Sequence, residues 1–368
     1  MIHEKEWSGN VIRNKRFIRT DLAIEAKESL DKLADYKQFK DKTFTEDGVE
    51  VNEVYLDKAS AQEIGKKQGT YITLSIKGVK LLNSEIQLKE MLVLTKTLSH
   101  LLKRKKIKDE DMGLVVGLGN RMITPDALGP LAVEQVIVTN HLFKLKDDSV
   151  SEGYRKVTAL SPGVMGVTGI ETSDIITSVV KKVKPDFVIV IDALAAKDSS
   201  RLGTTIQLTD TGIHPGSGVG NIREELSEEK LGIPVIALGI PTVVDTATIV
   251  NNTFNYVMYY FGREVNNEHR LKNKLITSHE VKKHEGLSEA DQLTEEGVKT
   301  LFGQFGSLSE EEKEVIFHDI LQMTNQNMIV TPKDIDRNIE DMAKIIASSI
   351  NGALHEDLSN QEQIYFTK

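Results

Sequence analysis

Apolar positions recur along this chain with two different periods, and these periods predict where helices and strands lie. Apolar and hydroxyl residues alternate from Tyr71 to Ile76, which predicts a strand with one face toward the core. Helical spacing from Ile86 to Arg104 predicts a long helix with an apolar stripe: Ile86, Met91, Leu94, Leu98, Leu101 and Leu102. A second stripe, near the C-terminus, predicts core or subunit contacts for Ile335, Ile339, Met342, Ile346 and Ile350.

Short apolar runs alternate with amphipathic segments through the centre of the chain. The runs Gly113–Leu118, Phe187–Ile191 and Ile233–Leu238 are typical of buried strands. Helical patterns cover Leu22–Tyr36, Ala127–Asn140 and Glu171–Lys184, and Thr172 or Ser173 is the expected cap of the last. Strands that alternate with helices favour parallel pairing with right-handed crossovers. We therefore expect an α/β fold: a mostly parallel central sheet flanked by helices, with extra N-terminal and C-terminal helical and strand elements.

Changes in composition divide the chain into four segments. Residues 1–21 form a leader with five basic and three acidic residues and the only tryptophan, Trp7. A free tail is the ordinary interpretation of such a terminus, and the apolar side chains of Trp7, Phe17 and Ile18 weaken it slightly. Residues 22–262 hold the predicted α/β catalytic core. Residues 263–292 are polar and charged, as in a linker or a surface excursion, and residues 293–368 are expected to form a helical region that packs on the core.

Charge and composition exclude several classes of protein. The net charge of −9 disfavours direct binding of nucleic acid, and the absence of cysteine excludes thiol nucleophiles, disulfides and cysteine-ligated zinc. No apolar run reaches the roughly 18 residues that span a bilayer, and the leader lacks the apolar centre of a secretory signal. There is neither a phosphate-binding P-loop nor a G-x-S-x-G nucleophile elbow. We expect a cytoplasmic protein without a membrane partner.

Two acids at the predicted strand ends are the candidate chemistry. Asp126 lies in the loop after Gly113–Leu118, and Asp192 directly follows Phe187–Ile191. The carboxyl ends of strands in an open α/β sheet meet at one edge, where two carboxylates can share a proton and activate a water molecule. Each aspartate could instead be a turn or helix-cap residue.

A glycine-rich loop contributes a third candidate, His214. Glycines 216, 218 and 220 follow it at alternating positions, a spacing that differs from the dinucleotide-binding fingerprint. Loops of this kind often approach a ligand closely, so His214, Gly216 and Gly218 are possible site residues. A surface turn with a solvated histidine is the alternative.

Taken together, three blocks resemble the germination proteases of spore-forming bacteria. They are Gly117–Pro130, which contains Asp126; Val190–Ala196, which contains Asp192; and Gly212–Arg223, which contains His214. The resemblance covers nearly the whole chain. It implies an atypical aspartic endopeptidase without cofactor, with Asp126 and Asp192 as its catalytic pair. It further implies a homotetrameric zymogen in the spore core that degrades small acid-soluble spore proteins during germination.

The leader also fits this family. Family substrates are cut after the acidic residue of a Thr-Glu-apolar-Ala sequence, and Arg19–Glu25 resembles such a site with Asp21 in place of the glutamate. The resemblance therefore implies that residues 1–21 are a propeptide released by self-cleavage between Asp21 and Leu22. A weaker likeness to hydrogenase maturation endopeptidases leaves an alternative, in which Asp126, Asp192 and His214 hold a nickel ion.

Overall fold

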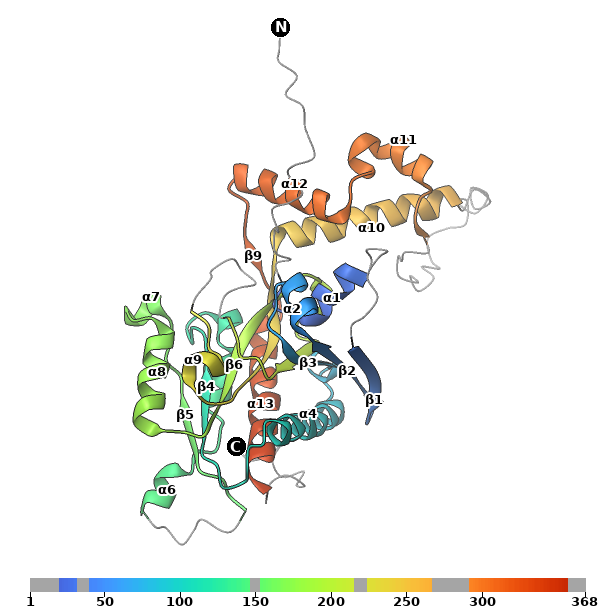
Figure 1. Ribbon diagram of the computed structural model, residues 1–368. Helices are drawn as coiled ribbons and strands as arrows, with labels where there is room; N and C mark the ends of the chain where they lie inside the picture. The colour runs from blue at the N-terminus through green and yellow to red at the C-terminus, as the bar shows by residue number, and fades with distance from the viewer. Residues whose placement is uncertain (1–19, 32–39, 146–152, 215–223, 267–290, 357–368) are drawn as a thin grey trace. The chain divides into compact units, whose positions relative to one another are not determined.

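The computed structural model describes residues 20–31, 40–145, 153–214, 224–266 and 291–356 (Figure 1). These residues form two compact units. The first contains the described residues of Met1–Lys197, Arg201–Val243 and Thr331–Lys368, and the second those of Asp198–Ser200 and Val244–Val330. Trp7, Gly216, Gly218 and most of the polar segment 263–292 lie outside the described residues.

A mixed sheet forms the centre of the first unit. Its strands follow the order β1 (Lys40–Glu46), β2 (Val49–Leu56), β3 (Gly69–Ser75), β7 (Thr205–Thr209), β8 (Val235–Asp245), β6 (Phe187–Ala196), β4 (Gly113–Gly117) and β5 (Val157–Leu160). β4 pairs in parallel with β5 and β6, whereas the series from β1 through β2, β3 and β7 to β8 is antiparallel. The α/β class is thus confirmed. The expectation of a mostly parallel sheet is wrong, because the half of the sheet from β1 to β8 is antiparallel.

Helices cover both faces of this sheet. The helices of the first unit are α1 (Ala23–Asp31), α2 (Lys58–Ile64), α3 (Gly78–Leu81), α4 (Ser84–Arg104), α5 (Leu128–Val133), α6 (Asn140–Leu145), α7 (Met165–Thr168), α8 (Thr172–Val183), α9 (Glu228–Leu231) and α13 (Ile335–Leu354). Apolar residues of α4, α5 and α13 share one large core with alternate residues of β3, β4, β6, β7 and β8. A second core joins α8 to the other face of β4, β6 and β8, and a third joins α1 and α2 to β2 and β3.

The helices and the strand that were predicted from the clearest apolar periodicity are confirmed. The strand at Tyr71–Ile76 corresponds to β3, and the amphipathic segment Ile86 to Arg104 lies within α4. Buried residues of the C-terminal stripe lie along α13 and belong to the large core: Ile335, Ile339, Met342, Ile346 and Ile350.

The predicted helix Ala127–Asn140 is wrong in its length. α5 ends at Val133, and α6 begins only at Asn140. Between them the N–H of Ile137 donates to Asn351 Oδ1 (2.9 Å), and the N–H of Thr139 donates to the carbonyl of Val157 (3.1 Å). Partners from α13 and β5 therefore replace the helical hydrogen bonds, an effect of tertiary structure that overrides local pattern.

The expected hydroxyl cap of α8 is also wrong. Glu171 occupies the N-cap position without a side-chain capping bond. Thr172 Oγ1 donates instead to the carbonyl of Gly163 (3.2 Å), and Ser173 Oγ donates to Glu224 Oε2 (2.8 Å). The two hydroxyls thus fasten the start of α8 to neighbouring loops.

The second unit is helical. It contains α10 (Thr246–Asn266), α11 (Glu295–Gly306) and α12 (Glu310–Met323), with β9 (Ile329–Val330) paired to the last residues of β8. Phe254 of α10 packs edge-on against Phe302 and Phe305, with ring centroids 5.2 Å away in both cases. A capping box between Ser309 and Glu312 starts α12.

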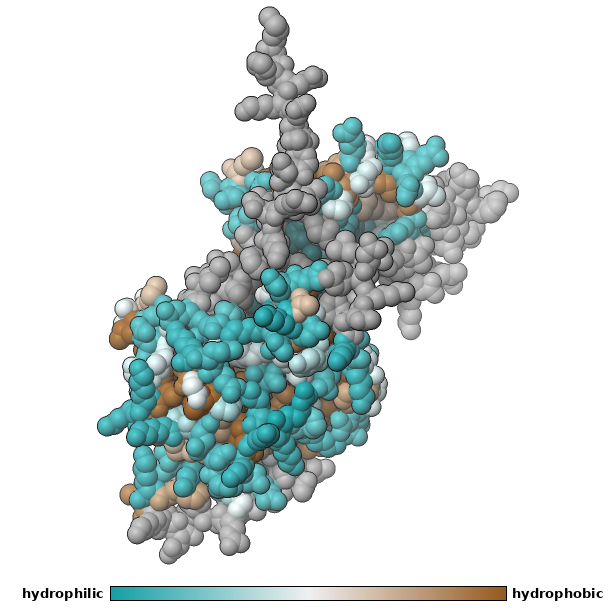
Figure 2. All heavy atoms as spheres, viewed as in Figure 1, coloured by the Kyte–Doolittle hydropathy of each residue, from teal (hydrophilic) through white to brown (hydrophobic). Residues whose placement is uncertain are grey.

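Hydrophilic side chains cover most of the described surface that Figure 2 shows for the first unit. Within the described residues, no helix combines the length and the apolar character required to cross a bilayer.

Candidate active site

Asp126 lies against the turn that follows β4. This turn begins at Gly119, whose φ of +112° is accessible to glycine. A Cβ at residue 119 would lie 2.0 Å from the main-chain oxygen of Asp126, so a larger residue would not fit. The N–H of Asn120 donates to Asp126 Oδ2 (2.7 Å) and fixes the carboxylate over the end of the strand. Asp126 itself ends a single 3-10 turn, Thr124–Asp126.

Asp192 lies inside β6, which continues to Ala196. The expectation that Asp192 follows the strand is therefore wrong, because the strand continues for five residues beyond Ile191. Its side chain is buried, with 6% exposed, and Oδ1 accepts a hydrogen bond from the N–H of Ala193 (2.9 Å). Val188 and Val190 of β6 belong to the core under α8, so alternation places Asp192 on that same face.

The chain segments that carry the two acids are in contact. The N–H of Leu118 donates to the carbonyl of Ile191 (2.8 Å), which directly precedes Asp192. On the other side, Thr242 Oγ1 of β8 donates to the carbonyl of Pro125 (2.7 Å), which precedes Asp126. The end of β4 and interior residues of β6 and β8 thus bring the chain segments of the two sequence-predicted aspartates together.

The segment around the expected cleavage bond binds at the end of β6. The N–H of Asp21 donates to the carbonyl of Ala195 (3.0 Å), and the N–H of Ala195 donates to Asp21 Oδ2 (2.8 Å). Gln207 of β7 contacts both sides of the Asp21–Leu22 bond. Its Nε2 donates to the Asp21 carbonyl (2.9 Å), and its Oε1 accepts from the N–H of Ala23 (2.6 Å).

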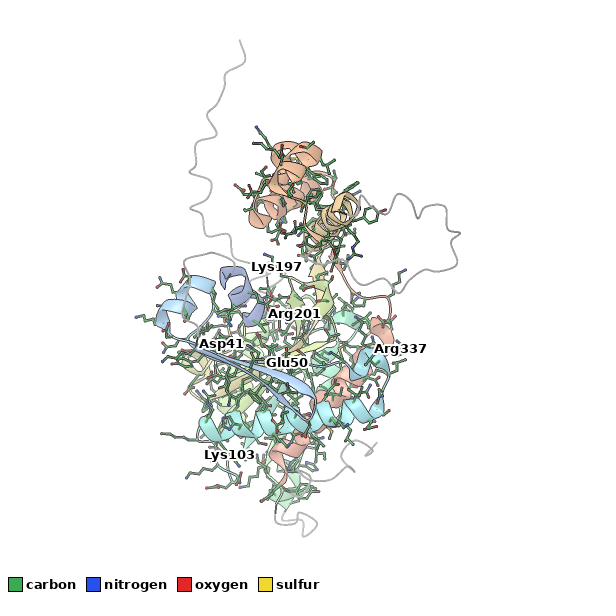
Figure 3. The ribbon with its side chains drawn as sticks, turned by 90° about the vertical axis from the view of Figure 1, so that its right-hand side faces the viewer. Asp41, Glu50, Lys103, Lys197, Arg201 and Arg337 are labelled. Atoms are coloured by element: carbon green, nitrogen blue, oxygen red, sulfur yellow. The ribbon has the colours of Figure 1, made fainter. Side chains whose placement is uncertain are left out.

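Charged side chains hold the flanks of this segment. Glu25 is buried, accepts hydrogen bonds from Thr20 Oγ1 and from the N–H of Lys197 (2.7 Å), and pairs with Arg201 Nε (3.5 Å). Figure 3 labels Lys197 and Arg201 beside α1. Lys66 Nζ donates to the carbonyl of Thr20 (2.7 Å). Residues 20–25 are therefore anchored at both ends.

Burial lowers the pKa of Lys66, because a desolvated ammonium is less stable than a solvated one. The carboxylates of Asp21 and Glu25 oppose this shift and favour the charged form. Lys66 and Asp21 are half-buried and Glu25 is buried, so one ammonium and two carboxylates compensate one another in a partly desolvated region.

His214 lies next to this region. Its Nε2 is 2.9 Å from Glu225 Oε2. Burial is the main cause that lowers the pKa of His214, and the carboxylate of Glu225 opposes the shift. The charges of Lys67 and Lys66 lower the pKa of His214 further, and that of Asp21 raises it. Within the described part of the chain, no three histidine or acidic side chains gather as metal ligands.

Three residues of this region, Gln207, Ala195 and Lys66, have no identifying pattern in the sequence. Gln207 lies in the middle of β7, where Thr205, Gln207 and Thr209 alternate with Ile206 and Leu208, so its polar character follows the ordinary alternation of a strand even though all five residues are buried. Ala195 acts through its main chain, and Lys66 acts through a contact with a residue 46 positions away. Neither leaves a pattern in the sequence.

Comparisons with known proteins agree with the resemblance. The family model of germination proteases matches residues 18–367. The germination protease of Bacillus mycoides (strain KBAB4) is 45% identical over 362 residues, which cover 96% of this chain and 98% of that protein. The germination protease of Bacillus pumilus (strain SAFR-032) is 47% identical over 350 residues, which cover 93% and 94%. The chain therefore belongs to the germination protease family.

Proposed function

We propose that this chain is an aspartic-type endopeptidase that first cuts itself between Asp21 and Leu22. It then degrades small acid-soluble spore proteins, cutting after an acidic residue in a Thr-Glu/Asp-apolar-Ala context. The observation that carries the proposal is the position of the Asp21–Leu22 peptide. It binds to Ala195, on the strand that carries Asp192, and to the side chain of Gln207.

The chemistry needs one proton shared by Asp126 and Asp192. The ionised carboxylate takes a proton from a water molecule, whose oxygen forms a bond to the carbonyl carbon of Asp21. The protonated carboxyl donates its proton to the departing nitrogen of Leu22 as the C–N bond breaks. The immediate products are a carboxylic acid on Asp21 and an amine on Leu22, and transfer of the proton from the acid to the amine gives the carboxylate and the ammonium. Two neighbouring carboxylates favour such sharing, because both do not ionise easily at short distance.

Replacement of either acid tests the assignment. Asp126→Asn and Asp192→Asn keep the shape of the side chain but remove the exchangeable carboxyl proton, so release of residues 1–21 should stop. Asp174→Asn on the exposed side of α8 is the matched control and should process normally. Intact mass identifies the new N-terminus at Leu22. Tryptophan emission gives a second measurement, because Trp7 is the only tryptophan and leaves with the leader. Normal processing in either asparagine variant would remove that residue from the mechanism.

The family also suggests where the protein acts and how it assembles. We propose that it is stored as a homotetramer in the cytoplasm of the developing spore, the spore core, and that it requires neither a membrane nor a nucleic acid partner. Native mass spectrometry of the full chain should show four copies. A monomer at micromolar concentration would contradict the assembly without affecting the catalytic assignment.

A further inference from the structure

Three residues on neighbouring strands form a row under the cleavage segment. Gln207 of β7 pairs in register with Gly239 of β8. Gly239 in turn lies against Asp192 of β6, since a Cβ at residue 239 would lie 2.3 Å from the Asp192 main-chain oxygen. The row therefore crosses β7, β8 and β6 in order.

Gln207 and Asp192 project from the same face of the sheet. Ile206 and Leu208, the neighbours of Gln207, belong to the core under α4 and α13, so Gln207 points the opposite way. Asp192 follows Ile191, which also belongs to that core, and so shares the orientation of Gln207. Neighbouring strands lie about 4.8 Å apart, so the main chains at Gln207 and Asp192, with one strand between them, are separated by about two strand spacings.

Gln207 spans the bond that is to be cut. Its Nε2 donates to the carbonyl oxygen of Asp21, and its Oε1 accepts from the N–H of Ala23, one residue beyond the bond (2.9 and 2.6 Å). Because the side-chain amide of Gln207 forms hydrogen bonds on both sides of the scissile bond, it fixes the position and the orientation of that peptide. The donor also faces the oxygen on which negative charge develops when water attacks, the position that stabilises a transition state.

The acidic side chain before the bond has its own partners. Asp21 Oδ2 accepts from the N–H of Ala195 (2.8 Å). The ammonium of Lys66, which bonds the carbonyl of Thr20 (2.7 Å), supplies positive charge beside it. A neutral side chain at residue 21 would deprive the Ala195 donor of its charged acceptor and would remove one of the two carboxylates near Lys66, leaving only Glu25.

We propose that Gln207 and the main chain of Ala195 form the subsite that aligns the scissile peptide, with Lys66 selecting an acidic residue before the bond. This inference rests on the proposed self-cleavage and names the groups that perform recognition. Protein substrates cut in trans would use the same groups once residues 20–23 have left them.

Variants of Gln207 test the alignment. Gln207→Ala removes both hydrogen bonds, and Gln207→Glu keeps the size but replaces the donor by an acceptor. Loss of a donor to the developing oxyanion typically costs about 100- to 1000-fold in rate, so both variants should release residues 1–21 at least about 100-fold more slowly. Gln68→Ala, an exposed glutamine, is the control. Thermal unfolding of each variant shows whether the fold is intact. A folded Gln207→Glu variant that processes at the wild-type rate would overturn this role.

A double-mutant cycle tests the selection of acid. Asp21→Asn should slow processing about 10- to 100-fold, the range of a charged hydrogen bond, while Asp21→Glu should be cut at a comparable rate to the wild type. Lys66→Met should slow the Asp21 chain but have little further effect on Asp21→Asn. If the folded double variant were slowed by the product of the two single-variant factors, Lys66 and Asp21 would act independently, and the role of Lys66 would be refuted.

The catalytic pair and the subsite fail in different ways. Normal processing in Asp192→Asn with slow processing in Gln207→Glu would reject the pair and keep the subsite. The reverse result would keep the pair and reject the subsite. A wild-type chain that never loses residues 1–21 would overturn both.

Discussion

Protonation of His355 should destabilise the folded chain in mildly acidic solution. This histidine follows α13 and is fully buried, with 0% exposed. Its Nδ1 accepts from the N–H of Arg155, and its Nε2 lies 3.3 Å from the carbonyl of Ile137 as the donor. The neutral tautomer with its proton on Nε2 satisfies both contacts. A second proton on Nδ1 would point at an N–H group, with no acceptor there.

The size of this loss of stability follows from the pKa of His355. Burial is the main cause that lowers the pKa of His355 to about 4, and the nearby positive charge of Arg155 acts in the same direction. The ordinary value in an unfolded chain is about 6.5. Between these pH values the unfolded state binds more protons, so the free energy of unfolding falls as the pH falls. Stability is complete above about pH 6.5, and the loss reaches about 3 kcal/mol by pH 4, at 1.36 kcal/mol per pKa unit.

Urea unfolding measured at several pH values between 7 and 4 checks this expectation. Carboxylates titrate in the same range, so the useful quantity is the difference between wild type and His355→Gln, whose amide has one donor and one acceptor but does not titrate. That difference should decrease steadily as the pH falls. His100→Gln, at an exposed position of α4, should parallel the wild type. A constant difference between wild type and His355→Gln across the range would refute the reasoning.

Two further predictions concern the strand end and the metal alternative. Gly129→Ala should destabilise the fold by at least about 1–3 kcal/mol, because its Cβ would lie 2.2 Å from the carbonyl oxygen of Leu118. Thermal unfolding measures this loss of stability. An unchanged unfolding midpoint would contradict the close approach of α5 to β4. Exhaustive treatment with a chelator should leave release of residues 1–21 unchanged, since the proposed mechanism uses carboxylates and water alone. Activity that disappears with the metal and returns with added nickel would instead favour the maturation-endopeptidase alternative.

Local pattern was sufficient for the elements that have one period and one buried face. α4 and α13 follow their apolar stripes, and β3 follows its alternation, because each packs a single face against the large core. The segment Ala127–Asn140 has a helical pattern but breaks, because Asn351 of α13 and Val157 of β5 supply partners that no local pattern contains. Long-range hydrogen bonds of this kind decide boundaries, not the existence of elements.

The candidate site divides in the same way. Asp126 and Asp192 could be proposed because strand ends of an α/β sheet meet at one edge, and the structure places their chain segments in contact. Gln207 could not be proposed, since its partners Asp21 and Ala23 are 186 and 184 positions away. An amide in a strand carries no signal of a peptide that folds over it from the other end of the chain.

Leu22 is fully buried, and this has a consequence for the fate of the cut chain. Hydrolysis before Leu22 would convert a neutral amide into an ammonium on Leu22 and a carboxylate on Asp21, two charged ends that are better solvated in water than beside a buried side chain. The fragment that remains would thus be driven toward solvent, and the two new ends would separate. The cut bond would then not re-form, and the released leader would not return to inhibit the same chain.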